Sequence, residues 1–405
     1  MTLKISTKLK RKEINYAGII FLFGLFLKQF YLRKSGSIQI ADVVVAFAAV
    51  MTLTSGKVYF QMKDVSLIIF IICGVAINVI YYLLMGNNFL NAALFLSYNL
   101  VVVIAFRSLM RKKEFPVGLL STMKANLLTQ LLIWLIGVGR NYSRDRYQGT
   151  FNDPNQFGFF IICCFFVLYL CSIYCKKRVH PIWHIIAGAL VVVSGSRGML
   201  LTFAIFLFFV LVYPIFSKKG TVIGIIYTIL FMILSGLVVA FGSSLFQNIR
   251  GIAEISSLDF VLKRFESLTS NKSIGGIFYS FFHNRLLIRF FRAPYYFLFG
   301  CGEGYWSRFI VISGEDNEPH CTMLSLCYCY GIIPYIFFIK WIRDNIKKVP
   351  VKAVGVYVAL ILEAFTLANH RQPFFWLIFA MGSYLLKESQ QVDSVESSDR
   401  RTANG

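Results

Sequence analysis

A short loop over residues 139–155, GRNYSRDRYQGTFNDPN, holds the chemistry-bearing residues that stand out first in this 405-residue chain. It gathers Arg140, Arg144 and Arg146 between long apolar stretches. The planar guanidinium of arginine can hold two phosphate oxygens at once. The loop ends in NDPN, residues 152–155, which suits a turn with Pro154 at the start of a helix. We interpret the loop as a site for an anion and a sugar; a charged loop with a helix cap is the alternative.

Another arginine, Arg197, belongs to the motif SGSRG at residues 194–198, between two apolar stretches. The link is so short that Arg197 must lie between two helix ends. Backbone N–H groups at the start of a helix favour phosphate. We therefore predict that Arg197 acts together with the arginine-rich loop, and the alternative is an arginine that anchors the boundary of a span.

His320, in the sequence EPHC at residues 318–321, opens a later apolar stretch. Histidine can take up and release a proton near neutral pH. His320 is therefore a candidate general base, and a histidine bonded to the backbone at a helix start is the alternative. The neighbouring Glu315, Asp316 and Glu318 could bind a hard cation, but a solvated acidic loop is the favoured interpretation.

Two other sets of residues are interpreted as structural and not as catalytic or ligand-binding. The sequence GCGEGYW at residues 300–306 has no Lys-Ser/Thr after it, so it predicts a tight turn that re-enters the apolar region and no nucleotide loop. The nine cysteines show no paired Cys-x-x-Cys spacing and are interpreted as small packing residues, although Cys301 and Cys321 could pair. We expect no metal site and no cofactor.

The elements that position these residues must sit in lipid. The chain is 57% hydrophobic and 15% charged, whereas soluble proteins have about 45–50% and about 25%. A soluble core could not cover so much apolar surface. The net charge of +22 is interpreted as basic loops that set membrane orientation, with no nucleic-acid partner.

Apolar windows of about 20 residues recur along the chain, as helices that cross a bilayer require. They predict an all-α integral membrane protein with about 12 transmembrane helices in a single domain, residues 15–387. The expected spans are 15–32, 38–55, 65–85, 90–110, 116–138, 156–175, 182–195, 199–216, 221–242, 322–341, 352–370 and 372–387.

Lysine and arginine alternate along the loops as the positive-inside rule requires if the N-terminus is cytoplasmic. The basic tail 1–14 and the tail 388–405, expected to be disordered, then both lie in the cytoplasm. Loop 139–155 and a long loop, 243–321, lie outside. Within the long loop, apolar spacing predicts a helix on the membrane surface at 244–268 and a second one at 278–299.

Several ionisable residues fall inside the expected spans, where charge is costly and therefore a functional candidate. They are Lys28, Asp42, Lys124 and Glu363, with His370 near a span end. Lys28 could extend its amine to the membrane surface, and Asp42 could lie at the interface. Glu363 would matter most in a transporter.

Four local features together resemble the O-antigen polymerase and ligase superfamily of bacterial envelopes, over about residues 140–335. They are Arg146 to Gln156 (RYQGTFNDPNQ) entering a span, the motif SGSRG, Arg285 followed by Gly300-Cys301-Gly302, and Pro319-His320 opening a span that continues to Gly331-Ile332. Their order and the long late loop match as well. Such proteins often carry Asn directly after the histidine, where this chain has Cys321.

The resemblance implies a GT-C-like, metal-independent glycosyltransferase of the bacterial cytoplasmic membrane, acting on its outer face. The donor would be an undecaprenyl-diphosphate-linked oligosaccharide, with a flippase and a chain-length regulator as working partners. The expected catalytic residues are His320, Arg197 and Arg146, and the expected substrate-binding residues are Arg140, Arg144, Asn152, Asn155 and Arg285. The arginines would neutralise charge growing on the diphosphate, and His320 would take the acceptor proton.

The favoured hypothesis is a polymerase of capsule, exopolysaccharide or O-antigen repeat units. A ligase that moves the glycan to another acceptor would carry out the same reaction. A transferase that uses polyprenyl-monophosphate sugars is disfavoured, because the first outer loop, residues 33–37, lacks the paired carboxylates of such enzymes. A flippase for lipid-linked sugars is the alternative from another class, and the long one-sided loop argues against it.

Overall fold

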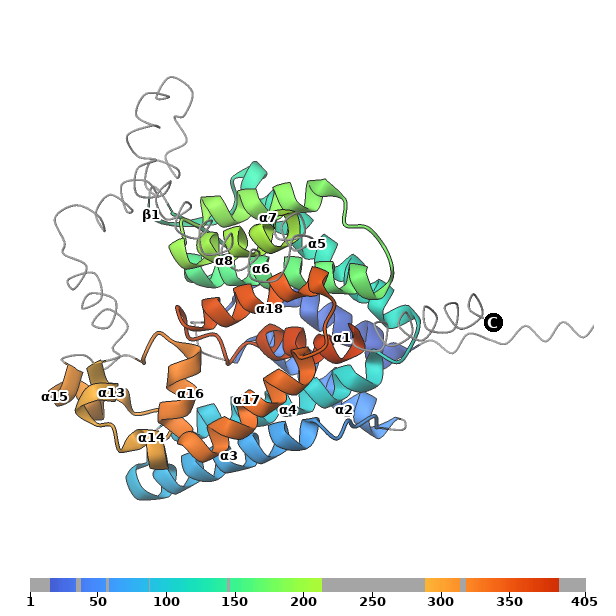
Figure 1. Ribbon diagram of the computed structural model, residues 1–405. Helices are drawn as coiled ribbons and strands as arrows, with labels where there is room; N and C mark the ends of the chain where they lie inside the picture. The colour runs from blue at the N-terminus through green and yellow to red at the C-terminus, as the bar shows by residue number, and fades with distance from the viewer. Residues whose placement is uncertain are drawn as a thin grey trace, which may run out of the picture.

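The computed structural model describes residues 15–33, 38–55, 58–86, 88–143, 146–212, 288–313 and 318–385. Over these residues the chain is mostly helical (Figure 1). The elements are α1 (Tyr16–Leu27), α2 (Ile40–Thr54), α3 (Asp64–Met85), α4 (Phe89–Leu109), α5 (Glu114–Ile136), β1 (Arg140–Ser143), β2 (Arg146–Gly149), α6 (Pro154–Tyr174), α7 (Pro181–Val193), α8 (Arg197–Leu207), η1 (Phe208–Val212), α13 (Ile288–Arg292), α14 (Tyr296–Phe299), η2 (Trp306–Phe309), α15 (Ile310–Ser313), α16 (Thr322–Tyr330), α17 (Ile332–Ile346), α18 (Val351–Ala364) and a last helix, Pro373–Leu385.

Helices α3, α4, α5 and α6 are each long and apolar enough to cross a membrane. Their outer faces expose large apolar side chains, such as Leu83 at 76% and Ile136 at 71%. Water would disfavour such surfaces, whereas lipid would not. The length of these helices and their apolar surfaces are consistent with a membrane protein.

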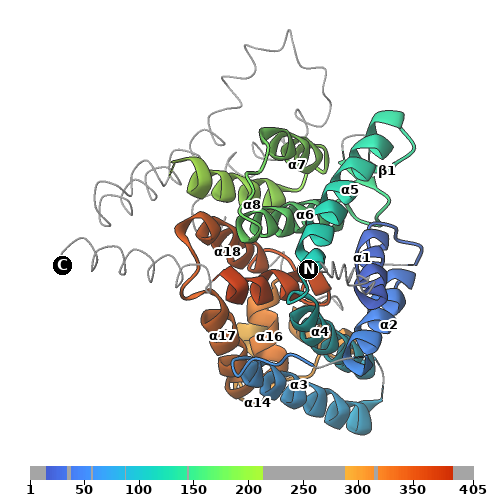
Figure 2. The same cartoon turned by 90° about the vertical axis from the view of Figure 1, so that its right-hand side faces the viewer.

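Helix α6 forms the centre of one half of the bundle. It is the most deeply buried of the four long apolar helices, and it packs against α5, α7, α8 and α18. Figures 1 and 2 show α5 to α8 on one side of the bundle and α3, α4, α16 and α17 on the other, with α18 between them. Helix α6 is therefore surrounded by other helices.

One end of the bundle carries the β1–β2 hairpin and is called the hairpin end below. Backbone and side-chain hydrogen bonds connect the segments there. Tyr31 N–H, after α1, donates to Thr150 O at 3.3 Å, and the Asn152 amide donates to Arg33 O at 2.6 Å. Tyr81, near the end of α3, donates through its hydroxyl to Gly300 O at 3.1 Å. The first two bonds join the loops after α1 and α5, and the third joins α3 to the turn that follows α14.

The structure corrects the sequence-based fold at three places. The fold is not purely α-helical, because β1 and β2 form a two-stranded antiparallel sheet inside the loop 139–155. The expected span 322–341 is two helices that meet at Gly331, which has a φ of +78°. The expected span 352–370 ends at Ala364, and residues 365–372 form a loop.

Gly331 has a steric reason for its conformation. A Cβ there would lie 2.5 Å from Leu298 O and 3.1 Å from Gly300 N. Only glycine accepts both the left-handed backbone and this close approach. The sequence around residue 331 is an uninterrupted apolar run. It does not predict the break, because the contact that requires glycine comes from a distant segment.

Several expectations fall on residues outside those described: both tails, the span 221–242, the helix 244–268 and part of the helix 278–299. From residue 288 onward the second of these helices is wrong as a single element. The chain forms two short helices, α13 and α14, with Pro294 between them. Proline lacks the N–H that a continuous helix needs.

The ionisable residues in the apolar region have defined partners. Lys28 and Asp42 are both buried within the protein and form an ion pair at 2.7 Å, which joins the end of α1 to the start of α2. The Lys124 amine lies 5.4 Å from the centre of the Trp183 ring. The Glu363 Oε1 accepts a hydrogen bond from the Asn369 amide at 2.6 Å.

The end of the bundle opposite the hairpin holds a second buried ion pair. Arg107 donates from Nη2 to Asp64 Oδ1 at 2.8 Å and from Nε to Asp64 Oδ2 at 3.1 Å. It also donates to Asn345 Oδ1 and to Ala380 O, at 2.8 and 2.6 Å. This guanidinium fastens α3, α4, α17 and the last helix together.

Candidate functional site

The hairpin is fixed to the bundle by aromatic side chains. The Tyr147 and Phe157 rings meet edge to face at 5.3 Å, and Phe151 is buried between Tyr31 and Phe160. Burial raises the pKa of Tyr147 to about 12, so its hydroxyl remains protonated at neutral pH. The hairpin therefore holds the residue next to Tyr147, Arg146, at a defined place.

Arg146 is only 8% exposed and links three segments. Its Nη2 donates to Asn155 Oδ1 at 3.0 Å, at the start of α6. Its Nε donates to Ser194 O at 3.4 Å, at the end of α7. The guanidinium thus lies where the hairpin, α6 and the turn before α8 converge.

The start of α6 follows from its sequence. Pro154 is its first residue, as predicted, and the Asp153 side chain accepts hydrogen bonds from the backbone N–H groups of Asn155 and Gln156, at 2.7 and 3.2 Å. Such a cap satisfies helix N–H groups that have no partner within the helix. The cap also fixes the direction of the Asn155 side chain.

The motif SGSRG makes the tight turn between α7 and α8. Gly195 has a φ of +59°, and Ser196 N–H donates to Ser194 Oγ at 3.2 Å. Ser196 occupies the N-cap position of α8 without a side-chain capping hydrogen bond, and Arg197 is the first residue of that helix. Arg197 is therefore held at a helix start, as its spacing predicts.

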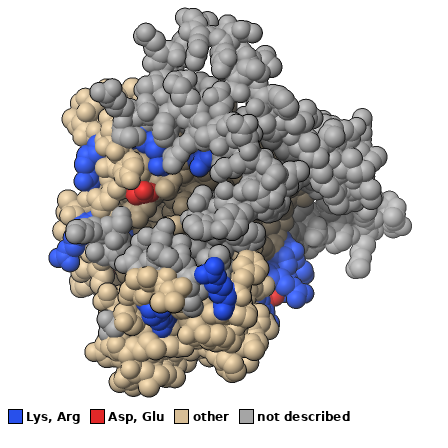
Figure 3. All heavy atoms as spheres, turned by 90° about the vertical axis from the view of Figure 1, so that its left-hand side faces the viewer, with Lys and Arg blue, Asp and Glu red and all other residues tan. Residues whose placement is uncertain are grey.

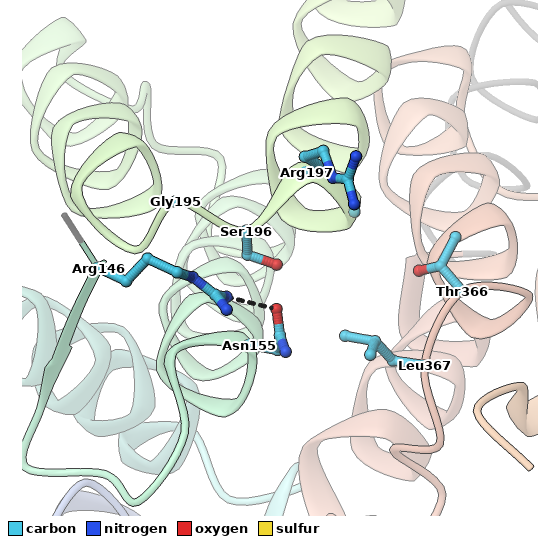
Figure 4. Close-up of a pocket in the computed structure, with 8 residues that line it drawn as sticks. Arg146, Asn155, Gly195, Ser196, Arg197, Thr366 and Leu367 are labelled. Atoms are coloured by element: carbon cyan, nitrogen blue, oxygen red, sulfur yellow. Dashed lines mark hydrogen bonds between the residues drawn. The ribbon is translucent and has the colours of Figure 1, made fainter. Parts of the chain in front are cut away.

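These segments enclose a pocket of about 190 Å³. Figure 4 shows its side chains converging from the hairpin, α6, α8 and the segment after α18. The lining residues are Arg146, Asn155, Gly195, Ser196, Arg197, Gly198, Thr366 and Leu367. We call it the two-arginine pocket, and we call Thr366–Leu367 its wall.

The charge of the two-arginine pocket favours an anion. Among the described residues that line it, two are arginines and none is acidic. The N-terminus of α8 also faces it with Ser196, Arg197 and Gly198, and a helix N-terminus carries a partial positive charge. Figure 3, which views the hairpin end, shows Lys and Arg at several places and little Asp or Glu on its described surface. A phosphate or diphosphate group would match this charge and size.

The other predicted binding residues lie elsewhere. Arg140 is exposed and donates to Thr150 O at 3.0 Å, and the Asn152 amide donates to Arg33 O. In the structure both side chains stabilise loops at the hairpin end and neither lines the pocket. Arg144 and Arg285 lie outside the described residues.

His320 is exposed and does not line the two-arginine pocket. Two residues after it, however, Thr322 contacts the wall. Thr322, the first residue of α16, donates to Leu367 O from its N–H at 2.9 Å and from its hydroxyl at 2.8 Å. The His320 turn and the wall are therefore joined by two hydrogen bonds.

Sequence reasoning missed the wall and an ion-paired cluster beside it. Glu303 is 3% exposed, and its Oε1 lies 3.0 Å from His370 Nε2 and accepts from Arg371 Nε at 2.8 Å. Arg371 Nη2 also donates to Glu318 Oε2 at 2.6 Å. We call Glu303, Glu318, His370 and Arg371 the clamp. The available signal was the presence of two acidic and two basic residues in segments expected at the outer surface.

The charge of Glu303 is set by its partners. Burial alone would raise the pKa of its carboxyl, but His370 and Arg371 outweigh burial and hold the pKa well below its ordinary value. Glu303 is thus ionised at neutral pH, and a buried carboxylate requires such partners. The carboxylates of the clamp are therefore bound to its basic side chains as one connected network.

No metal site is evident among the described residues, where no three His, Cys, Asp or Glu side chains gather as ligands. Glu318, which was considered as part of a cation site, is bound to Arg371. Cys301 and Cys321 are buried free thiols, so the considered disulfide is absent.

The geometry can hold a diphosphate-sized anion next to a turn that carries a histidine. Comparison of the chain with protein-family models and with curated proteins found no match.

Proposed function

We propose that this protein polymerises undecaprenyl-diphosphate-linked oligosaccharide repeat units at the outer face of the bacterial cytoplasmic membrane. In this proposal the chain has about twelve spans, both termini are cytoplasmic and the hairpin end faces outside. The basic loops support the orientation, and the apolar helices support membrane insertion. The observation that carries the proposal is the two-arginine pocket at the N-terminus of α8.

The pocket suits the leaving group of this reaction. An acceptor hydroxyl oxygen attacks the anomeric carbon of the donor, and the bond from that carbon to the diphosphate oxygen breaks with both electrons leaving on oxygen. One more negative charge then resides on the diphosphate. Arg146 and Arg197 would stabilise that charge as it grows. Fixed cations that bind the transition state more strongly than the ground state increase the reaction rate.

His320 would accept the proton of the attacking hydroxyl. It is exposed, and its turn is hydrogen-bonded to the pocket wall through Thr322. A histidine at this place could reach an acceptor sugar that enters from water while the lipid diphosphate occupies the pocket. Transfer to a different acceptor by the same chemistry would make the protein a ligase.

The decisive experiment is reconstitution of the full chain with a lipid-diphosphate-linked repeat unit, in the presence of EDTA. A ladder of longer glycans would support the proposal, and transfer of one glycan to an added acceptor glycolipid would show a ligase. Movement of the intact donor across the bilayer with no new glycosidic bond would show a flippase and overturn the proposal.

Three variants test the site in the same assay. Arg197→Ala and His320→Ala should each abolish the ladder, because one removes charge stabilisation and the other the proton acceptor. Arg178→Ala is the matched control, since Arg178 is an exposed arginine in the α6–α7 loop and does not line the pocket. A ladder that survives both site substitutions would reject the site while leaving the activity intact.

A further inference from the structure

The clamp lies beside the two-arginine pocket and shares none of its lining residues. Its centre is Glu303, in the turn before η2. The second carboxylate oxygen, Oε2, accepts from the Tyr330 hydroxyl at 2.6 Å, and the backbone N–H donates to Asn78 Oδ1 at 2.8 Å. Glu303 thereby connects α3, α16 and the segment after α18.

Arg371 extends this connection to the His320 turn. Its guanidinium binds Glu303 and Glu318 together, at 2.7 and 2.6 Å from Nη2. Glu318 precedes His320 by two residues. One side chain therefore ties the turn before η2 to the turn before α16.

The loop 365–372 carries both Arg371 and the pocket wall. Its backbone is fixed by neighbours: Asn369 N–H donates to Thr322 Oγ1 at 2.8 Å, and Trp376 Nε1 donates to His370 O at 2.6 Å. The wall also meets α8 closely, since a Cβ on Gly198 would lie 3.0 Å from Thr366 Oγ1. A shift of this loop would move the wall relative to α8.

We propose that Arg371 is a positioning residue: through the clamp it fixes the wall of the two-arginine pocket and the His320 turn relative to each other. This inference rests on the proposed function, because the two parts it aligns are the leaving-group site and the proton acceptor. Misplacement of reacting groups by about 1 Å can lower a rate by about 100-fold.

The clamp contains its own test, because the His370 ring lies 3.0 Å from Glu303 and carries a positive charge only when it is protonated. In Arg371→Gln, His370 must carry the positive charge that Glu303 requires. Protonated His370 can do so, whereas neutral His370 leaves a buried carboxylate without a counter-charge. The geometry of this variant should therefore be better preserved at low pH, which favours the charged imidazole, than at high pH, which favours the neutral one.

Other titratable and charged groups also face Glu303. Tyr330 and Cys329 face it from α16 and carry a phenol and a thiol, which ordinarily titrate above about pH 8. Arg308, from η2, donates to Cys301 O and Gly302 O. Glu318 is partly exposed and binds Arg371.

The experiment compares wild type, Arg371→Gln and the double variant Arg371→Gln/His370→Gln at about pH 6 and about pH 8. The glycan-transfer rate and the melting temperature in detergent, with and without inorganic pyrophosphate, are measured for each. Wild type should bind pyrophosphate and transfer glycan at both pH values. Arg371→Gln should keep kcat at the lower pH and lose about 100-fold at the higher, with a raised donor KM at the higher pH because the displaced wall is part of the pocket; the double variant should be inactive at both.

Glu318→Gln provides a variant that folds, since Glu318 lies at the partly exposed edge of the clamp. It should lower kcat at both pH values without a new pH dependence, because Glu303 keeps the permanent charge of Arg371. Wild-type rates in Arg371→Gln at both pH values would overturn the inference, as would an equal loss at both.

The proposed function and this inference can fail separately. If wild type transfers no glycan, pyrophosphate should still raise the melting temperature of wild type at both pH values and that of Arg371→Gln only at the lower one; that result keeps the clamp and rejects the transferase. If pyrophosphate stabilises neither protein at either pH, both ideas are rejected.

Discussion

Replacement of Arg197 by glutamine is the sharpest single perturbation of the proposed site. Glutamine keeps a polar side chain and a good helix former at the first residue of α8, but it removes the charge. In the proposed reaction one negative charge develops on the leaving diphosphate. The substitution should therefore lower the rate of bond breaking more than the binding of the donor, which already carries negative charge.

The size of the effect follows from Coulomb's law. Two unit charges about 4 Å apart interact by about 4 kcal/mol at an effective dielectric constant of about 20. The pocket is open to solvent and Arg197 is half-buried, so the usable part is smaller. Loss of one fixed donor at a developing oxyanion typically costs about 10²–10³ in kcat. We expect Arg197→Gln to lower kcat about 100-fold.

The assay is single-turnover transfer from a lipid-diphosphate-linked glycan in proteoliposomes, with donor in excess of its KM. Arg197→Lys should recover part of the rate, since lysine restores charge but not the planar fork. Arg178→Gln is the matched control, because Arg178 is exposed in the α6–α7 loop. A kcat for Arg197→Gln within about threefold of wild type, against the about 100-fold loss expected for a donor to the oxyanion, would refute the reasoning.

Three further substitutions test how the fold supports the site. Asp153→Ala removes the cap of α6 and should lower the free energy of unfolding by about 1 kcal/mol, which denaturant titration in detergent can measure; an unchanged midpoint would contradict the cap. A Cβ added at Gly158 would lie only 2.8 Å from Met199 Cγ. Gly158→Val should therefore lower the free energy of unfolding by about 1–3 kcal/mol and reduce transfer. Normal transfer by this variant would show that the turn before α8 tolerates displacement. Arg107→Gln leaves Asp64 buried without its cation and should destabilise the protein by about 3–5 kcal/mol, while the transfer rate per folded molecule stays the same because Arg107 lies at the opposite end.

The helices were predictable because their causes are local. Long apolar windows predicted α3 to α6 to within two residues at each boundary. Pro154 predicted the start of α6, because proline suits the first residue of a helix and Asp153 can cap it. The motif SGSRG likewise predicted a turn with Arg197 at a helix end.

The remaining features depend on contacts between segments far apart in the sequence. The break at Gly331 is required by the backbone of Leu298, which no pattern around residue 331 contains. The hairpin depends on packing of Tyr147 against Phe157. The wall was hidden because residues 352–370 read as one apolar span, whereas α18 ends at Ala364.

The sequence predicted the two arginines of the candidate site but not the clamp beside them. Arg146 and Arg197 were expected to act together, and both line one pocket. The clamp could not be derived, because Glu303 and Arg371 are separated by 68 positions and sequence alone does not pair them. Placement of Glu303 depends on Asn78 and Tyr330, which come from two further helices.

The two ends of the bundle use arginine in different ways, and the difference bears on function. Arg107 binds both oxygens of Asp64 and three further acceptors, so its charge is compensated within the fold. Arg146 donates to Asn155 Oδ1 and Ser194 O, and together with Arg197 it lines a pocket in which the described lining residues include no acidic side chain. An anion bound there would be attracted by both guanidinium groups. Anything that binds the folded state alone stabilises it. Under the proposed function a lipid diphosphate would be that anion, so its binding should raise the free energy of unfolding.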